Sequence, residues 1–273
     1  AANGGNGNLF SRQTLVGVSS DQLGSLSLGQ QLSPYILAQA LTNQGVGNFW
    51  VNRAIMGGGL QNAAVNATSG GTNGGFFMKN AIQYTSPNIA GWQVYALTTT
   101  KNGADNLTNN GADNGGLAAQ NNFDKYTSLA LNGSIAGVNL WLANQDNKDA
   151  FRSWTIGASY PLTDELNISA NYINHKDKIN DLTTKSYAIG ATYKIAPAIS
   201  LVGQYARNNL DDAQSLYNIG ASYALSKRTS AYVTYVRATN GAISSLADRG
   251  SYTNDGSVTS SNRNIVVGMT HSF

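Results

Sequence analysis

Side chains that could perform covalent or metal chemistry are few in this sequence, and their spacing does not fit a reaction. The two histidines, His175 and His271, are far apart in the chain and lack the ligand spacing of a zinc site. The glycine run at 57–59 lacks the Gly-Lys-Ser/Thr ending of a phosphate loop. No serine lies in a nucleophile motif with a histidine and an acid. We therefore expect no enzyme, no catalytic residue, no metal and no cofactor.

The chemistry that remains is electrostatic, and it depends on where the few charged residues lie. Charged residues make up 11% of the chain, well below the roughly 25% of average soluble domains. The 17 basic residues form no run and leave a net charge of +3, too small to indicate nucleic acid binding. No Asp or Glu occurs between Asp21 and Asp105, whereas Arg53 and Lys79 lie in that interval. Such a segment favours anions where it lines a pore.

The composition favours an ordered β protein. The chain of 273 residues holds 30 Gly, 4 Pro and no Cys, and its 14 Tyr and 7 Phe are too many aromatics for a disordered chain. No apolar run approaches the roughly 18–20 residues of a membrane helix. The lack of Cys fits a bacterial envelope protein, and residues 1–8 show no signal peptide. A transmembrane barrel remains possible, because an apolar outside and a polar inside give an unremarkable average hydropathy.

The elements that must position these side chains show a period of two, which is typical of strands rather than helices. Apolar positions alternate with small polar ones in four segments of the second half of the chain. Their apolar faces carry Trp154, Ile156, Ala158 and Tyr160; Leu166, Ile168, Ala170 and Tyr172; Tyr187, Ile189, Ala191 and Tyr193; and Tyr217, Ile219, Ala221, Tyr223 and Leu225.

The aromatic spacing on these faces is the sharper signal. Six strand residues span about 20 Å, which roughly matches the two aromatic girdles that bound the ~25 Å apolar band of an outer-membrane barrel. The alternative is a sandwich core, which does not need aromatics at both ends of each strand. We expect girdle positions for the pairs Trp154 and Tyr160, Tyr187 and Tyr193, and Tyr217 and Tyr223, and also for Tyr126, Tyr172 and Tyr205.

Short and long connections alternate along the chain, as in outer-membrane barrels. Short ones are expected near 21–24, 86–91, 134–137, 161–165, 196–198 and 226–228, and long ones near 33–78, 100–123, 145–151, 174–184, 208–214 and 238–262. They separate thirteen strands, at 9–20, 25–32, 79–86, 91–99, 124–133, 138–144, 152–160, 166–173, 185–195, 199–207, 215–225, 229–237 and 263–273.

The strand count and the last residue both indicate a bacterial outer-membrane barrel. Single-chain barrels close with an even number of strands, so we expect an odd number of further strands before residue 1. The last strand ends on Phe273, and a terminal aromatic of this kind is the residue that barrel assembly machinery reads. We therefore expect Phe273 to be an assembly signal.

Five segments resemble the trimeric general porins of Gram-negative bacteria. They are residues 8–18 (NLFSRQTLVGV), 23–31 (LGSLSLGQQ), 81–88 (AIQYTSPN), 220–229 (GASYALSKRT) and 267–273 (VGMTHSF). The resemblance implies a single barrel domain over residues 1–273, all-β and antiparallel, with sixteen strands in the full protein. Residues 1–273 would then supply strands four to sixteen and lack the first three.

The resemblance also implies that residues 33–78 form the loop that folds into the lumen and narrows the channel. Its length is unusual for a loop without function, and Phe49, Trp50, Phe76 and Phe77 would pack it against the wall. The alternative is a loop that stays outside. By the family pattern the side of the first strand that carries Arg12, Thr14, Val16 and Val18 faces the lumen, and Lys79 also points inward. The constriction residues are then Arg12, Gln30, Arg53 and Lys79.

The expected function is passive diffusion of small hydrophilic solutes and ions through a weakly anion-preferring constriction. The resemblance implies a homotrimer in contact with outer-membrane lipid and lipopolysaccharide. A solute-specific channel, a soluble β-rich binding protein and an envelope adhesin or structural barrel remain as alternatives. Acidic residues expected in external loops could bind Ca²⁺ or bridge lipopolysaccharide through cations, although solvated charges are the plainer interpretation: Asp105, Asp113, Asp146, Asp149, Asp211 and Asp212.

Overall fold

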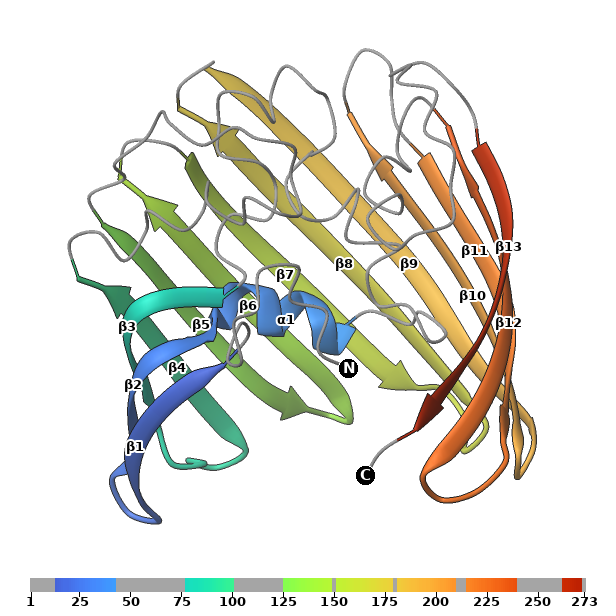
Figure 1. Ribbon diagram of the computed structural model, residues 1–273, viewed down its shortest axis with the longest axis horizontal. Helices are drawn as coiled ribbons and strands as arrows, with labels where there is room; N and C mark the ends of the chain where they lie inside the picture. The colour runs from blue at the N-terminus through green and yellow to red at the C-terminus, as the bar shows by residue number, and fades with distance from the viewer. Residues whose placement is uncertain are drawn as a thin grey trace.

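Thirteen antiparallel strands form one curved sheet in the computed structural model, which describes residues 13–42, 77–100, 125–148, 151–178, 181–209, 215–239 and 262–271. The expected number of strands is confirmed, and each strand pairs with its neighbours in chain order, so that β1 and β13 form the two edges (Figure 1). The strands are β1 (Thr14–Ser20), β2 (Gly24–Leu32), β3 (Phe77–Thr85), β4 (Trp92–Thr99), β5 (Tyr126–Ile135), β6 (Val138–Asn147), β7 (Phe151–Pro161), β8 (Leu166–Asp177), β9 (Leu182–Ala196), β10 (Ile199–Asn208), β11 (Ser215–Ala224), β12 (Thr229–Ala238) and β13 (Asn262–His271).

Tight turns join the strands at one rim of the sheet, the lower one in Figure 1. We call it the short-turn rim, and it holds residues 21–23, 86–91, 136–137, 162–165, 197–198 and 225–228. In the two-residue turn at 136–137 both residues take positive φ angles, 50° for Ala136 and 80° for Gly137. A type I′ hairpin turn requires such angles. The opposite rim, where the remaining connections lie, is called the long-loop rim.

Two connections at the long-loop rim are shorter than the sequence predicts. The connections expected at 145–151 and 174–184 shrink to 148–150 and 178–181, because β6, β8 and β9 continue past their apolar residues. Gln145, Asp146, Asn174 and Lys176 belong to these extensions. Polar residues ended the apolar alternation and so appeared to end the strands. A ladder of backbone hydrogen bonds does not depend on apolar side chains, and it continues above the apolar band.

The two faces of the sheet have opposite character. Large apolar side chains are exposed on the outward face, among them Val267 (76%), Ile219 (66%) and Ile189 (57%). The inward, concave face carries buried Ser, Thr, Asn and Gln together with apolar residues of all sizes, from Ala143 to Trp141. Apolar rows of this extent are not left facing water, since each square ångström costs roughly 25 cal/mol. No helix among the described residues is long and apolar enough to cross a membrane.

A helix that the sequence analysis missed, α1 (Pro34–Thr42), lies on the concave side of the sheet (Figure 1). Ser33 caps it, accepting a hydrogen bond from the Ile36 amide at 3.4 Å, and proline at the first helical position is favourable. Its buried side chains Tyr35, Ile36 and Ala38 pack on Trp141 and on two wall alanines, Ala130 and Ala143. The serine-proline start followed by an apolar run was the available signal.

Candidate functional site: the inner wall and helix α1

One register row of polar side chains crosses the inner wall opposite α1. Pairing between β5 and β9 sets Ser128, Gln145, Ser153, His175 and Thr184 side by side. All five are buried, with at most 8% of each residue exposed. Buried polar groups are costly unless they are hydrogen-bonded. The polar side chains of the row therefore need hydrogen-bond partners, and they find them on neighbouring strands.

A chain of hydrogen bonds joins this row to the start of α1. The Tyr126 hydroxyl donates to Gln145 Oε1 at 2.9 Å, so the hydroxyl of Ser33, 2.8 Å away, donates to the Tyr126 oxygen. Gln145 Nε2 donates to Ser153 Oγ at 3.2 Å. The Ser153 hydroxyl lies 2.7 Å from His175 Nδ1. The chain thus runs from the cap of α1 across β5, β6 and β7 to β8.

A second contact holds the first turn of α1 against β5. The Tyr35 amide donates to Ser128 Oγ at 3.0 Å, and the Ser128 hydroxyl donates to the Asn144 carbonyl at 2.9 Å. A free N–H group at a helix start would otherwise be orphaned away from water. Tyr126 itself is completely buried on this inner face, which corrects its expected place in the outer girdle. α1 is therefore fixed to the wall by both packing and hydrogen bonds.

Of the four predicted constriction residues, the structure describes Gln30 in full and only the backbone of Lys79. Arg12 and Arg53 lie outside the described residues. Lys79 lies in β3, but its side chain also lies outside them. Gln30 pairs with Thr14 and falls in the same row as Leu28 on the outward face, so its expected placement on the wall is corrected. The neighbouring Gln31 is buried instead, where Ser27 Oγ donates to it at 2.5 Å.

The outward row also corrects the face assigned to the first strand. Val16 pairs with Leu28 and Val18 with Leu26, and these leucines pair in turn with Ile82 and Tyr84 of β3. That row belongs to the exposed apolar face, so the prediction that the Thr14–Val18 side lines the lumen is wrong. A one-residue difference in register is enough to exchange the two faces of a strand.

A bulge in β3 explains why simple alternation fails near Lys79. The pairing with β2 shifts between Gly29 and Gln31, and Asn80 takes a positive φ of 49°. As a result Met78 and Ala81 are both buried although three positions separate them. A bulge inserts one residue and reverses the alternation beyond it. The count that placed Lys79 inward from Ile82 and Tyr84 does not hold across this point.

The six residues of the predicted girdle pairs are all exposed on the outward face, from 37% for Tyr160 to 50% for Tyr223. Trp154, Tyr187 and Tyr217 lie towards the long-loop rim of their strands, and their partners lie towards the short-turn rim. Neighbouring rings are in contact: Trp154 with Tyr172 at 5.2 Å and Tyr205 with Tyr217 at 4.8 Å between centroids. That the girdle contacts a membrane remains a prediction. Phe273 lies outside the described residues.

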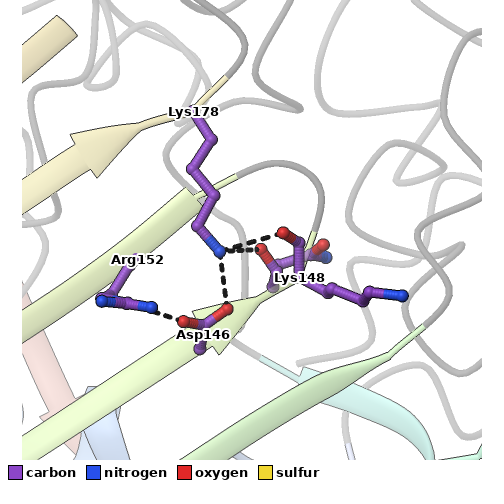
Figure 2. A network of polar contacts seen from close by, with 5 residues as sticks. Asp146, Lys148, Arg152 and Lys178 are labelled. Atoms are coloured by element: carbon purple, nitrogen blue, oxygen red, sulfur yellow. Dashed lines mark hydrogen bonds and ion pairs between the residues drawn. The ribbon is translucent and has the colours of Figure 1, made fainter. Parts of the chain in front are cut away.

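Charged residues at the long-loop rim form a small network (Figure 2). Lys178 Nζ donates to Asp146 Oδ1 at 2.7 Å and to the carbonyls of Asn147 and Lys148 at 3.0 Å each. Arg152 Nε donates to the other oxygen of Asp146 at 2.7 Å. The network joins the β6–β7 and β8–β9 connections. Asp146 therefore lies in a strand and is paired by two cations, which corrects its expected place in a loop.

A second ion pair spans the β8–β9 connection. Lys176 Nζ donates to an Asp181 carboxylate oxygen and, at 2.9 Å, to its carbonyl. The hydrogen bond from Lys176 lowers the pKa of Asp181 below its ordinary value. Because the pKa of Asp181 is lowered only in the folded state, the ion pair contributes its full stability above the ordinary carboxyl pKa of about 3.9. This contribution is lost as the pH falls through the lowered pKa of the folded state.

We predict that Asp146→Asn lowers the free energy of unfolding by less than about 1 kcal/mol, because ion pairs at an exposed rim are weak. The measurement is urea unfolding of the folded barrel at low salt and at about 1 M salt, where screening should reduce the difference. Asp164→Asn in the opposite, short-turn rim is the control. A loss that is larger and independent of salt would contradict the electrostatic account.

Comparison with known proteins places this geometry in context. A family model described as a Gram-negative porin matches residues 1–242. Among solved structures, the anion-selective porin from Comamonas acidovorans is 23% identical, with a TM-score of 0.70 over 97% of this chain and 78% of that chain. OmpT of Vibrio cholerae is 13% identical, with a TM-score of 0.61 over 94% and 78%. OmpF of Salmonella typhi is 15% identical, with a TM-score of 0.53 over 82% and 70%. No curated protein matches the chain.

Proposed function

Since the chain belongs to the Gram-negative porin family of the bacterial outer membrane, we propose that it lets small hydrophilic solutes and ions diffuse passively through a constriction that weakly prefers anions. The porin fold is a transmembrane antiparallel β-barrel, and the sheet matches it. The anion preference is the finer part of the proposal, and it rests on the charges of the wall and of the segment that begins with α1.

The observation that carries the preference is the lack of acids between Asp21 and Asp105, beside a described wall whose buried polar residues include no acid. Every buried polar residue in the described part of the chain is Ser, Thr, Asn, Gln or His. The stretch between Asp21 and Asp105 holds no acid and contains Arg53 and Lys79. Neutral polar groups conduct either sign of ion, whereas fixed cations in a narrow passage attract anions. The related porin from Comamonas acidovorans is itself described as anion-selective.

Helix α1 supports the proposal that residues 33–78 form an inward constriction loop. The helix starts this segment, and the hydrogen-bond chain from Ser33 to His175 holds it inside the curved sheet. The residues beyond Thr42 would narrow the passage from this anchored start. We also propose a homotrimer, as described for one form of OmpT, in contact with outer-membrane lipid and lipopolysaccharide. An envelope adhesin or structural barrel is the alternative function.

We predict that the double substitution Arg53→Glu with Lys79→Glu changes the ion preference. In planar bilayers under a KCl gradient the original protein should give a chloride-leaning reversal potential, and the variant a potassium-leaning one. Lys227→Glu, in the turn at 225–228, is the matched control and should leave the potential unchanged. Current steps in groups of three would support the trimer.

Two other outcomes contradict different parts of the proposal. A strong potassium preference of the original protein would overturn the anion preference while leaving the channel intact. A folded barrel without conductance would overturn passive diffusion and favour the adhesin or structural barrel.

A further inference from the structure

Two tyrosine rings lie against each other on the outward face of the sheet. Tyr205 of β10 and Tyr217 of β11 stand directly opposite each other in the strand pairing. Their ring centroids are 4.8 Å apart and their planes are inclined by 41°. This distance is the shortest between aromatic rings of the described residues. Cross-strand aromatic pairs stabilise sheets, but here both partners are phenols, which also have a radical chemistry.

The Tyr205 ring is held in place from its other side as well. Its hydroxyl is in hydrogen-bonding contact with Tyr187, Arg207 and Ser215. The Tyr187 ring meets it edge-on, at 6.2 Å between centroids and an angle of 63°. These contacts leave Tyr205 only partly exposed, whereas Tyr217 is 44% exposed. A ring that is already fixed beside its partner loses little rotational freedom when the two react.

An apolar hollow opens beside the two rings. It has a volume of about 660 Å³, and Tyr205 and Tyr217 line it together with small residues such as Ala191 and Gly203. A Cβ built on Gly203 would meet no atom within 4 Å, so the space above this residue is open. The hollow therefore admits a small apolar molecule to the rings from the lipid side, and it leaves the rings room to turn.

Two adjacent phenols beside an apolar opening fit a reaction with radicals of the lipid phase. We propose that Tyr205 and Tyr217 form an oxidative cross-linking site, which gives hydrogen atoms to organic peroxyl radicals and couples into dityrosine. The product ties β10 to β11 covalently. Because the two residues are already paired, the cross-link requires no change of register.

The reaction balances with two peroxyl radicals for each cross-link. Each radical takes the hydrogen atom of one phenol O–H and becomes a hydroperoxide, so that both tyrosines become phenoxyl radicals. The two unpaired electrons then form a bond between the ring carbons next to the hydroxyl-bearing carbons. The hydrogen on each of these carbons moves to the phenoxyl oxygen and restores both phenols. In total the two peroxyl radicals are reduced, and the tyrosine pair is oxidised by the loss of two hydrogen atoms.

The reaction goes beyond the channel function and uses only the location in the outer membrane. The chain has no Cys, so no thiol of this chain intercepts the radicals before they reach the phenols. Tyr193 and Tyr223 are also exposed, but no ring contact between described residues includes them. We therefore expect coupling towards the long-loop rim, between Tyr205 and Tyr217, and not at the short-turn rim.

The test exposes the folded protein in lipid vesicles to a lipid-soluble azo initiator, which releases alkylperoxyl radicals. Trypsin then cuts after Arg207, so that Tyr205 is the only tyrosine of peptide 195–207 and Tyr217 lies in peptide 208–227. Mass spectrometry should find these two peptides joined, with a mass two hydrogen atoms below their sum. Tyr217→Phe should lose the joined product. Tyr223→Phe, a matched control in the same peptide, should keep it.

An internal control shows that the radicals reached the barrel. It is oxidation of Met269, which is 66% exposed. Oxidised Met269 without the joined product would overturn the proposal, and so would an equal amount of peptide 195–207 joined to peptide 186–194, which carries Tyr187. Gly203→Leu fills the hollow and should lower the yield, whereas an unchanged yield would overturn the route through it. Conductance of the untreated protein tests the proposed channel separately, and its absence leaves the cross-linking result unaffected.

Discussion

Tyr126→Ala should lower the free energy of unfolding by about 3–5 kcal/mol, the usual cost of removing a large buried aromatic side chain. Tyr126 is completely buried, where it contacts the apolar cluster of Met78, Leu97 and Phe151. Its hydroxyl also connects Ser33 with Gln145. The substitution therefore leaves a cavity and two unsatisfied polar groups on the inner wall, and it removes one of the hydrogen-bond links between α1 and the sheet.

Two further variants separate the packing from the hydrogen bonds. Tyr126→Phe keeps the ring and should cost only about 1–3 kcal/mol, the penalty of buried groups left unpaired. Tyr160→Ala, on the outward face, should cost less than Tyr126→Ala. The measurements are heat or urea unfolding together with single-channel conductance, which should rise in Tyr126→Ala as α1 leaves the wall. An unchanged conductance in a destabilised Tyr126→Ala barrel would contradict the anchoring role of the residue.

Ile189→Arg should destabilise the barrel in a bilayer by about 2–4 kcal/mol, the cost of a cation near the middle of the lipid-facing surface. Ile189 is 57% exposed and lies in the register row between Ala170 and Tyr205. In water an exposed arginine would be harmless, so a loss of this size arises only if the outward face contacts lipid.

Ile195→Arg is a close control, because both residues are exposed isoleucines of β9. Ile195 is 50% exposed and lies beyond Tyr193, near the short-turn rim. There the cost should be only about 0–1 kcal/mol, because the head of the side chain reaches the interface. The measurement is reversible unfolding from lipid vesicles. Equal costs at the two positions would contradict the membrane placement of the girdles.

The strand content was predictable because alternation is a local property. The pattern in residues such as Trp154, Ile156 and Tyr160 needs no knowledge of the partner strand, since successive side chains point to opposite faces of any strand. The exposed position of the aromatic pairs was predictable for the same reason. Prediction failed at the ends of β6, β8 and β9, where polar residues continue the strand without the apolar signal.

Placing residues on the wall required the tertiary structure. The bulge at Asn80 reverses the alternation of β3, and the pairing of Thr14 with Gln30 puts the first strand's apolar residues outside. The bulge depends on pairing between β2 and β3, which residues 33–76 separate, whereas the face of the first strand follows from its pairing with β2 across the tight turn at 21–23. For this reason the assignment of Gln30 failed and that of Lys79 lost its support. Tyr126 alternates regularly in β5, on the buried side with Ser128 and Ala130, so local alternation could have placed it.

The sequence by itself determined the number of strands, their antiparallel class, the outward aromatic pairs and the scarcity of acids before Asp105, since each depends only on residue type and short spacing. Only the tertiary structure decided that α1 is tied through Tyr126 to His175, and that the rings of Tyr205 and Tyr217 lie against each other. The register between strands sets these neighbours, and register arises from the packing of the whole sheet.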